Sequence, residues 1–296
     1  MFPKEFQYAS PRTVQETVQL LNRFGTEAKI LAGGQSLIPL MKLRIASPKY
    51  LIDINRIRDL EYVRESGEFL LIGALTRHHT LERSELVKDK VPILSETASS
   101  IGDPQVRNLG TIGGSIVHSD PAGDWGATMI ALRASFNVKS LRGERSLDSD
   151  HIFSDTLTSS LSPDELLTEI SILIPPRDRS GGAYEKFERK VGDFATVGAA
   201  AQITLDKAKK AFEKIGIGLT SVAPTSMRAR RAEESLLGRD VTLANLDEAA
   251  TIASEEARPI DDVLRGSAEF KRAMTKVFLK RALIKAAGRA GVIEIE

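Results

Sequence analysis

The sequence predicts an α+β fold with more than one hydrophobic core, and three observations support this prediction. The chain has 296 residues, of which 42% are hydrophobic, and this is ample for more than one core. Its candidate strands and helices form groups and do not follow strict βαβ alternation. Prolines and glycines between residues 175 and 182 form the best linker. We therefore divide the chain into residues 1–176 and residues 177–296.

The first of these regions contains two groups of elements, which we expect to form lobes of about residues 1–56 and 57–176. The first lobe is predicted to be a small α/β unit. One of its segments has apolar residues at helical spacing, and two short apolar runs are typical of buried strands. The predicted helix spans residues 11–24, and the predicted strands span residues 28–32 and 50–54.

The second lobe begins with a predicted hairpin, because Gly67 provides a turn between two β-like runs. Asp103 and Pro104 then end a helical pattern. The segment 110–118 is glycine-rich and then β-like. Strands are predicted at 61–64, 69–72, 136–141 and 166–174, and helices at 75–87, 92–101 and 124–132.

The C-terminal region has three candidate strands followed by three candidate helices. This order favours α+β packing over a parallel α/β sheet. The strands are predicted at 184–189, 196–205 and 212–219, and the helices at 227–237, 243–256 and 268–287.

Composition argues against several classes of function. The formal net charge is +1, which gives no electrostatic case for binding nucleic acid or an acidic membrane face. No apolar run approaches the roughly 20 residues that span a bilayer, and residues 1–6 lack the pattern of a signal peptide. We therefore expect a cytoplasmic protein without an integral membrane segment. The chain has no cysteine, and its four histidines show no metal-ligand spacing, so we expect neither an iron–sulfur cluster nor another metal site.

Two segments with paired glycines are candidates for binding phosphate. The first glycine loop comprises Ala32, Gly33, Gly34, Gln35 and Ser36, and the second comprises Thr111, Ile112, Gly113, Gly114 and Ser115. Paired glycines accept positive φ angles and let the backbone approach a ligand, so that successive amides converge on an anion. A single Gly-Gly pair is also compatible with a simple turn. Neither loop is a Walker A or Rossmann motif, so a dinucleotide would be bound by another device.

These loops and their surroundings resemble the FAD-binding medium subunits of the molybdenum hydroxylases, with carbon monoxide dehydrogenase as the nearest type. The resemblance covers nearly the whole chain. Its specific elements are Ala-Gly-Gly and Thr-Ile-Gly-Gly in this order, and Gly-Asp-Phe-Ala at residues 192–195 extends the resemblance into the C-terminal half. Further matching segments are residues 32–44, 51–55, 72–76, 104–115, 118–121 and 265–270.

The resemblance implies a two-lobed FAD domain of the vanillyl-alcohol-oxidase (PCMH) type and a smaller C-terminal α+β domain with a three-stranded antiparallel sheet. It implies that both glycine loops hold the FAD pyrophosphate, and that Asp124, Leu167 and Phe194 contact the cofactor. Asp124 is equally a candidate helix N-cap, and Leu167 also fits an ordinary core position. Phe194 stands where many relatives carry Tyr or Trp, so no hydroxyl is offered to the flavin there.

Three basic residues remain open between two roles. Lys186, Arg189 and Lys190 are candidates for facing the flavin, but they also fit a solvated strand face. No catalytic triad or carboxylate pair is found in the chain, and we expect no catalytic residue.

The function implied by the resemblance is electron relay. A large molybdopterin-binding subunit would oxidise the substrate, and a small subunit with [2Fe-2S] clusters would pass electrons through FAD on this chain to an external acceptor. The expected assembly is a dimer of heterotrimers. Two alternatives stay open: a stand-alone FAD-dependent reductase of the same superfold, and a scaffold subunit that has lost its cofactor.

Overall fold

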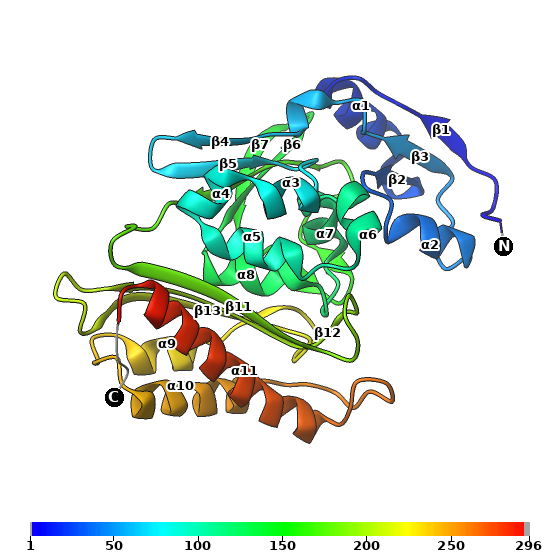
Figure 1. Ribbon diagram of the computed structural model, residues 1–296. Coiled ribbons are helices and arrows are strands. Elements are labelled where there is room, and N and C mark those ends of the chain that lie inside the picture. Colours follow the sequence, from blue (N-terminus) through cyan, green and yellow to red (C-terminus); the bar gives the residue numbers. More distant parts are fainter. Residues whose placement is uncertain (1, 293–296) are drawn as a thin grey trace.

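The N-terminal part of the chain is built on a small parallel sheet. The computed structural model describes residues 2–292. Its first sheet has the strand order β1–β3–β2, with both pairings parallel. The elements are β1 (Gln7–Ala9), α1 (Val14–Phe24), η1 (Gly25–Glu27), β2 (Ala28–Leu31), α2 (Leu37–Lys42) and β3 (Tyr50–Asp53). Because the strands are parallel, their carboxyl ends meet at one edge, and the first glycine loop leaves from that edge (Figure 1).

The second unit is a five-stranded antiparallel sheet with the order β4–β5–β10–β6–β7. Its strands are β4 (Val63–Ser66), β5 (Phe69–Gly73), β6 (Ser135–Ser140), β7 (Gly143–Asp148) and β10 (Leu166–Leu173), with a small pair β8 (Phe153–Asp155) and β9 (Thr158–Ser159). Its helices are η2 (Arg58–Leu60), α3 (His78–Arg83), α4 (Glu85–Lys90), α5 (Pro92–Ser99), α6 (Pro104–Leu109), α7 (Ile112–His118) and α8 (Asp124–Ala131). Helices α3 to α8 lie between this sheet and the C-terminal sheet (Figure 1).

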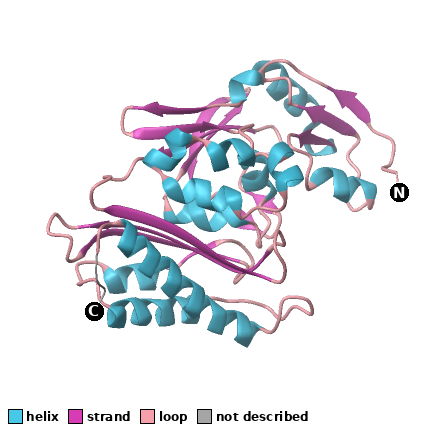
Figure 2. Cartoon of the chain, in the orientation of Figure 1, coloured by secondary structure: helices cyan, strands magenta, loops and turns pink. Residues whose placement is uncertain are grey.

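The C-terminal unit is an antiparallel sheet covered by helices on its outer face. Its strands are β11 (Ser180–Glu188), β12 (Ala195–Leu205), β13 (Phe212–Thr220) and β14 (Met227–Arg228), in that spatial order. Its helices are α9 (Arg230–Leu236), α10 (Leu243–Glu256) and α11 (Ala268–Arg289). Figure 2 shows alternating layers of sheet and helix, and each of the three larger sheets has its own cluster of buried hydrophobic residues. The α+β class is confirmed.

Helix α8 lies directly on the C-terminal sheet because glycines face it. A Cβ atom on Gly216 or Gly218 of β13 would lie 2.0 Å from the carbonyl oxygen of Ala131 or Ala127, respectively. A side chain at either position would push the helix away from the sheet. Asp124 is the first residue of α8. This close contact therefore fixes the Asp124 carboxylate between the two halves of the chain.

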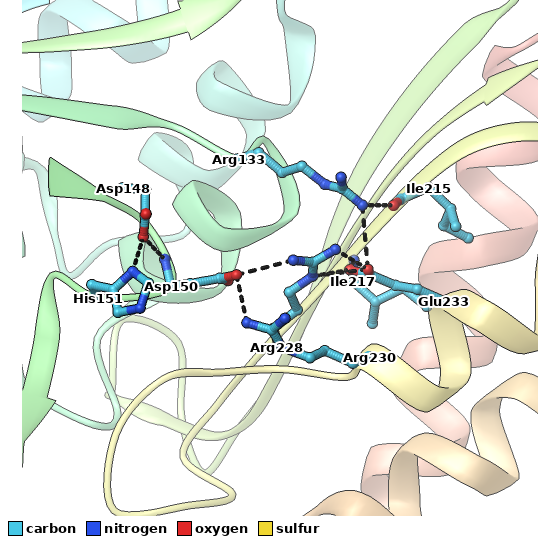
Figure 3. A network of polar contacts seen from close by, with 9 residues as sticks. All are labelled: Arg133, Asp148, Asp150, His151, Ile215, Ile217, Arg228, Arg230 and Glu233. Carbon is cyan, nitrogen blue, oxygen red and sulfur yellow. Dashed lines mark hydrogen bonds and ion pairs between the residues drawn. The ribbon is translucent and has the colours of Figure 1, made fainter.

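An ion-pair network joins the same two parts of the molecule (Figure 3). Glu233 of α9 is 3% exposed, and its carboxylate accepts a hydrogen bond from the amide of Ile217 at 2.8 Å. The same carboxylate pairs with Arg228 at 2.6 Å and with Arg133 at 3.4 Å. Arg228 also contacts Asp150 at 3.0 Å. Because every buried charge has partners, the network holds the two parts together without leaving an uncompensated ion.

Most elements expected from the sequence are confirmed. Helix α10 begins and ends where the apolar spacing places it, and the hairpin around Gly67 is present with its first strand two residues further along the chain. Confirmed within a few residues are the helices expected at 11–24, 92–101, 124–132 and 268–287, and the strands expected at 28–32, 50–54, 136–141, 166–174, 184–189, 196–205 and 212–219.

Three expectations are wrong. The segment 110–118 is helical from Ile112 onward, because Thr111 caps α7 and outweighs the β-branched residues that suggested a strand. The helix expected at 75–87 is two helices, because Ser84 ends α3 with an extended ψ of 118° and caps α4. The helix expected at 227–237 starts later, since β14 pairs with β13. Elements β1, α2, α6, β7, β8 and β9 were not expected.

Candidate functional site

The first glycine loop is an open turn with unpaired amides. It connects β2 to α2, and Gly34 adopts a φ of 72° that side-chain-bearing residues rarely accept. Within residues 2–292, the amides of Gly33, Gly34, Gln35 and Ser36 donate to no acceptor. Residues 33–36 are half-buried. Their four consecutive free donors are therefore available to an anion that approaches this turn.

The second glycine loop has a different local structure. It forms the N-cap and first turn of α7, and neither Gly113 nor Gly114 lies in the left-handed region. The amides of Ile112 and Gly113 donate to the carbonyls of Thr76 and Ala74, both at 3.0 Å. The expectation that both glycine pairs use positive φ and converging amides is therefore wrong for this loop.

What the second glycine loop offers to a ligand is hydroxyl groups and an exposed backbone surface. Thr111 accepts a hydrogen bond from the amide of Gly114 at 3.2 Å, so its own hydroxyl hydrogen stays free to donate. Gly114 is exposed and Ser115 is half-buried. Gly114 lies on the side of α7 that faces the first glycine loop, since the nearest atom of that loop to a Cβ placed there belongs to Ala32.

The two loops lie side by side because glycines remove the atoms that would separate them. A Cβ atom on Gly33 would lie 2.3 Å from the carbonyl oxygen of Leu109 and 2.7 Å from the Cα atom of Gly110. A Cβ atom on Gly114 would lie 3.7 Å from the Cβ atom of Ala32. The ten residues predicted to hold the cofactor phosphates are thus brought to one place by the fold.

Two residues that were not singled out from the sequence link the two glycine loops through hydrogen bonds, and we call this line of contact the seam. Arg77 donates hydrogen bonds to the carbonyl oxygen of Leu109 and, at 2.7 Å, to the side-chain oxygen of Asn55. Asn55 in turn donates to the carbonyl oxygen of Ala32 at 2.8 Å. Asn55 follows a strand of the parallel sheet, and a polar residue at such a carboxyl end is the feature that could have identified it.

A buried histidine packs against Gly110, the residue that precedes the second glycine loop. His78 is 4% exposed, and its Nδ1 accepts a hydrogen bond from Nε1 of Trp125 at 3.1 Å. Its backbone amide donates to the carbonyl of Gly110 at 3.1 Å. Burial, together with the positive charges of Arg77 and Arg107, lowers the pKa of His78 to about 4. The ring is therefore neutral near pH 7.

A second polar cluster surrounds Asp124 at the start of α8. Asp124 is 6% exposed and accepts a hydrogen bond from the Tyr184 hydroxyl at 2.6 Å. Its carboxylate lies 3.2 Å from Nζ of Lys186, which also contacts Glu188 at 3.2 Å and donates to the carbonyl of Ser100 at 3.0 Å. Burial raises the pKa of Asp124 and raises that of Tyr184 well above 10, so the tyrosine stays a hydrogen-bond donor.

This arrangement corrects two expectations. Asp124 is not the N-cap of α8, because Gly123 occupies that position and the Asp124 side chain makes no capping bond. Lys186 does not lie on a solvated strand face, since its side chain is only 5% exposed. Arg189 and Lys190 are exposed, in agreement with the solvated alternative.

Phe194 and Leu167 lie in different environments. Phe194 is 45% exposed on the turn between β11 and β12, and the guanidinium of Arg265 lies 5.9 Å from its ring centroid. The following amide, that of Ala195, donates to the carbonyl of Ala122 at 3.3 Å, which places Phe194 beside the segment that leads to Asp124. Leu167 is 3% exposed and packs in the core of the second unit.

The other histidines do not join these clusters. His79 lies 3.9 Å from Glu82, His118 is the last residue of α7, and His151 contacts Asp148 at 2.6 Å on the surface. Across residues 2–292, no group of three or more His, Asp or Glu side chains is arranged to hold a metal ion. No helix of the described chain is long and apolar enough to cross a membrane.

The donors of the two glycine loops and the side chains around Asp124 and Phe194 are of the types that bind the parts of FAD. Free amides and hydroxyls from the two glycine loops suit a diphosphate, which needs several donors and close backbone approach. The cluster of Asp124 and Lys186 and the ring of Phe194 offer polar and apolar contacts for a second, larger group. The residues present therefore suit a dinucleotide that carries a ring system at its other end.

Comparison with known proteins gives two family matches that together cover most of the chain. Residues 4–176 match the FAD binding domain in molybdopterin dehydrogenase. Residues 182–286 match the CO dehydrogenase flavoprotein C-terminal domain.

Individual relatives match along their whole length. The carbon monoxide dehydrogenase medium chain of Hydrogenophaga pseudoflava is 43% identical, over 96% of this chain and 97% of that one. A subunit of the 6-hydroxypseudooxynicotine dehydrogenase complex of Paenarthrobacter nicotinovorans is 37% identical, over 98% and 97%. A solved structure of carbon monoxide dehydrogenase from Hydrogenophaga pseudoflava superposes with a TM-score of 0.94 and covers 98% of this chain and 99% of that one.

Proposed function

Since the chain belongs to the FAD-binding medium subunits of the molybdenum hydroxylases, we propose that it relays electrons through FAD from a cluster-bearing partner to an external acceptor. The bound flavin supplies the redox chemistry, because it can accept electrons singly and release them in pairs. The protein's own residues bind the cofactor, orient it and set its surroundings.

The observation that carries this proposal is the row of free amides at Gly33 to Ser36 directly beside the second glycine loop. A diphosphate placed there would receive backbone donors from the first loop and hydroxyl donors from Thr111 and Ser115. We further propose that Asp124, Leu167 and Phe194 contact the rest of the cofactor. Lys186 joins them, since its ammonium is buried against Asp124.

The proposed partners follow from what this chain lacks and from what its relatives are. It has no cysteine, so the thiolates that hold [2Fe-2S] clusters would come from another subunit. Relatives are named as medium chains or as subunits of complexes. We propose a large molybdopterin-binding subunit and a small [2Fe-2S] subunit as partners, assembled as a cytoplasmic dimer of heterotrimers.

We also propose that the chain has two domains, residues 1–176 and 177–296, with the first divided into lobes near residue 56. In this division the glycine loops belong to the first domain, and Lys186 and Phe194 to the second. The cofactor would then lie where the domains meet, and both would be needed to enclose it.

The test is to purify the chain with its partner subunits and to follow its flavin. We expect absorbance near about 450 nm, typical of oxidised flavin, with one FAD per chain and bleaching when substrate of the complex is added. A colourless complex that cannot be reconstituted with FAD would favour a scaffold subunit. Rapid turnover of a small substrate by the isolated chain with a nicotinamide donor would favour a stand-alone reductase.

A further inference from the structure

A surface cavity beside the parallel sheet is walled mainly by basic side chains. Its volume is about 430 Å³, and its lining residues are Arg12, Asn55, Arg56 and Arg58. Within residues 2–292, no acidic side chain lines this cavity. Its volume lies in the range of about 300–1,000 Å³ that is common for small-molecule pockets. We call it the arginine cavity.

The fold brings the four lining residues together because two parallel strands end at the same edge of the sheet. Strands β1 and β3 pair in parallel. Arg12 lies in the segment that follows β1, and the other three lining residues lie in the segment that follows β3. In open sheets of parallel strands, ligands bind outside the carboxyl ends of the strands. The arginine cavity therefore lies where this rule places a ligand.

The backbone that carries the three arginines is anchored on both segments. The amide of Arg12 donates a hydrogen bond to the carboxylate of Glu16 at 2.7 Å, at the capped start of α1. Ile57 lies between Arg56 and Arg58 and is 1% exposed, so the core holds this segment in place. The guanidinium groups themselves are exposed, but their points of attachment stay close together.

The positive charges of the arginine cavity have no carboxylate partner in the part of the chain that the structure describes. Other arginines there form ion pairs, such as Arg107 with Glu82 at 2.9 Å, but none of the three cavity arginines does. Asp53 ends β3 but is occupied, because its carboxylate accepts hydrogen bonds from the Tyr8 hydroxyl at 2.7 Å and from the amide of Asn55 at 2.9 Å. Like charges around one cavity repel one another, and an anion placed among them relieves this repulsion.

We propose that the arginine cavity is a second anion site, which binds the phosphate group of a small molecule and is separate from the two glycine loops. Guanidinium groups bind phosphate through pairs of parallel N–H donors, and several of them together suit a group with more than one negative charge. Asn55 forms the wall towards the first glycine loop, since its Nδ2 donates to the carbonyl of Ala32 at 2.8 Å. A ligand in this cavity would therefore lie beside FAD and not in its place.

The experiment titrates inorganic pyrophosphate into the assembled complex with FAD bound, so that the glycine loops are already occupied. Isothermal titration calorimetry should show saturable binding that weakens as salt is added, because salt screens exposed charges. In Arg12→Gln and in Arg56→Gln, which remove one charge but keep a polar side chain, we expect the dissociation constant to rise by about tenfold to a hundredfold. This is the loss typical of a hydrogen bond between charged groups.

A matched control and a second probe sharpen this result. Arg83→Gln removes the same charge from an exposed position at the end of α3 that does not line the cavity, and it should bind pyrophosphate as the unchanged complex does. Flavin absorbance should be the same in all variants, because the site is separate from the glycine loops. A titration with ADP identifies the source of the phosphate: tighter binding than pyrophosphate indicates a nucleotide, and weaker binding indicates inorganic phosphate or a compact ester.

Several outcomes would overturn the second site. These are no binding of either probe, equal affinity in the two cavity variants and the unchanged complex, and an equal loss in Arg83→Gln, which would report general attraction to a basic surface. Loss of FAD together with pyrophosphate would assign the arginines to the cofactor instead. Binding by the isolated full chain but not by the complex would show that a partner protein covers the cavity. A complex that takes up no FAD overturns the proposed function alone, because the cavity variants can still be compared with Arg83→Gln.

Discussion

The two glycine loops contain the same Gly-Gly pair but use it for different physical purposes. In the first loop Gly34 turns the chain through a left-handed conformation and leaves a row of amides free. In the second loop Gly113 and Gly114 lie in a helix, and the amide of Gly113 is bonded to the carbonyl of Ala74. A glycine pair thus predicts that the backbone comes close to something, but not whether that partner is a ligand or another part of the chain.

Within each loop, the two glycines also differ from one another. Gly33 and Gly113 face protein backbone, where a Cβ atom would lie 2.3 Å and 2.6 Å from carbonyl oxygens. Gly34 and Gly114 face side chains, where a Cβ atom would first meet Ile38 or Thr111, both at 2.7 Å. We therefore expect the first glycine of each pair to matter for the fold and the second to matter for the cofactor.

The largest effect should come from Gly33→Val and Gly113→Val. Each would force backbone apart at the seam, and we expect a loss of at least about 3 kcal/mol in the free energy of unfolding. Chemical denaturation of the FAD-free chain measures this loss in the free energy of unfolding. Gly288→Val is the matched control, because a Cβ atom there meets nothing within 4 Å and Val has a higher helix propensity than Gly, so stability should not fall. Native stability in both seam variants would remove the distinction between the glycines.

The next largest effect should be acid destabilisation through His78. Its pKa is about 4 in the folded chain against 6.5 for the free side chain, so the unfolded chain binds more protons between these values. Stability is therefore lost as the pH falls from 6.5 towards 4, by roughly 3 kcal/mol for this one buried group. Urea denaturation at pH 7 and pH 4 should show that the unchanged protein loses this much more than His78→Gln. Parallel pH profiles would mean that His78 is not held neutral beneath the second glycine loop.

A smaller effect on stability, but a complete effect on the cofactor, is expected for Gly34→Val. A β-branched residue at a φ of 72° is strained, and we expect a cost of about 2 kcal/mol with loss of FAD. Gly114→Val should also lose FAD, at a lower cost, because Gly114 is exposed and not in the left-handed region. The ratio of flavin to protein absorbance measures both. Full flavin content in both variants would remove the phosphate role of the loops.

The smallest effects on stability are expected when a hydroxyl group is removed from either glycine loop. Thr111→Val removes the N-cap of α7 and should cost about 1 kcal/mol of stability. Ser36→Ala should leave stability unchanged, because the Ser36 side chain does not cap α2, and should weaken FAD binding severalfold. Melting temperature and FAD titration of the two variants separate these outcomes; equal loss of stability in both would show that the loops are more alike than their hydrogen bonds indicate.

Sequence reasoning identified the loops because glycine pairs and family motifs are local features. It also located α10 and the long C-terminal strands, whose apolar spacing continues over many residues. It described residues 110–118 as glycine-rich and then β-like, whereas the cap by Thr111 and the contact with Ala74 favour a helix from Ile112 onward.

The parts of the site that were missed depend on contacts between distant residues. Arg77 contacts Leu109, and Tyr184 contacts Asp124 across 60 positions of the chain. For Lys186 the solvated strand face was the favoured interpretation, because a period-2 strand pattern gives no information on what covers that face. Such partners are set by how the sheets stack, which no local pattern records.

The pairing of Asp124 with Tyr184 and Lys186 has a consequence for how such a chain can be divided or recombined. A fragment that ends at Pro175 and Pro176 would keep both glycine loops but would leave Asp124 without its hydroxyl donor and its cation. A hybrid made by exchanging the C-terminal half with that of a relative would face the same difficulty unless the three residues are inherited as a set. The proposed flavin site therefore depends on both halves, because the partners of Asp124 all come from the second half.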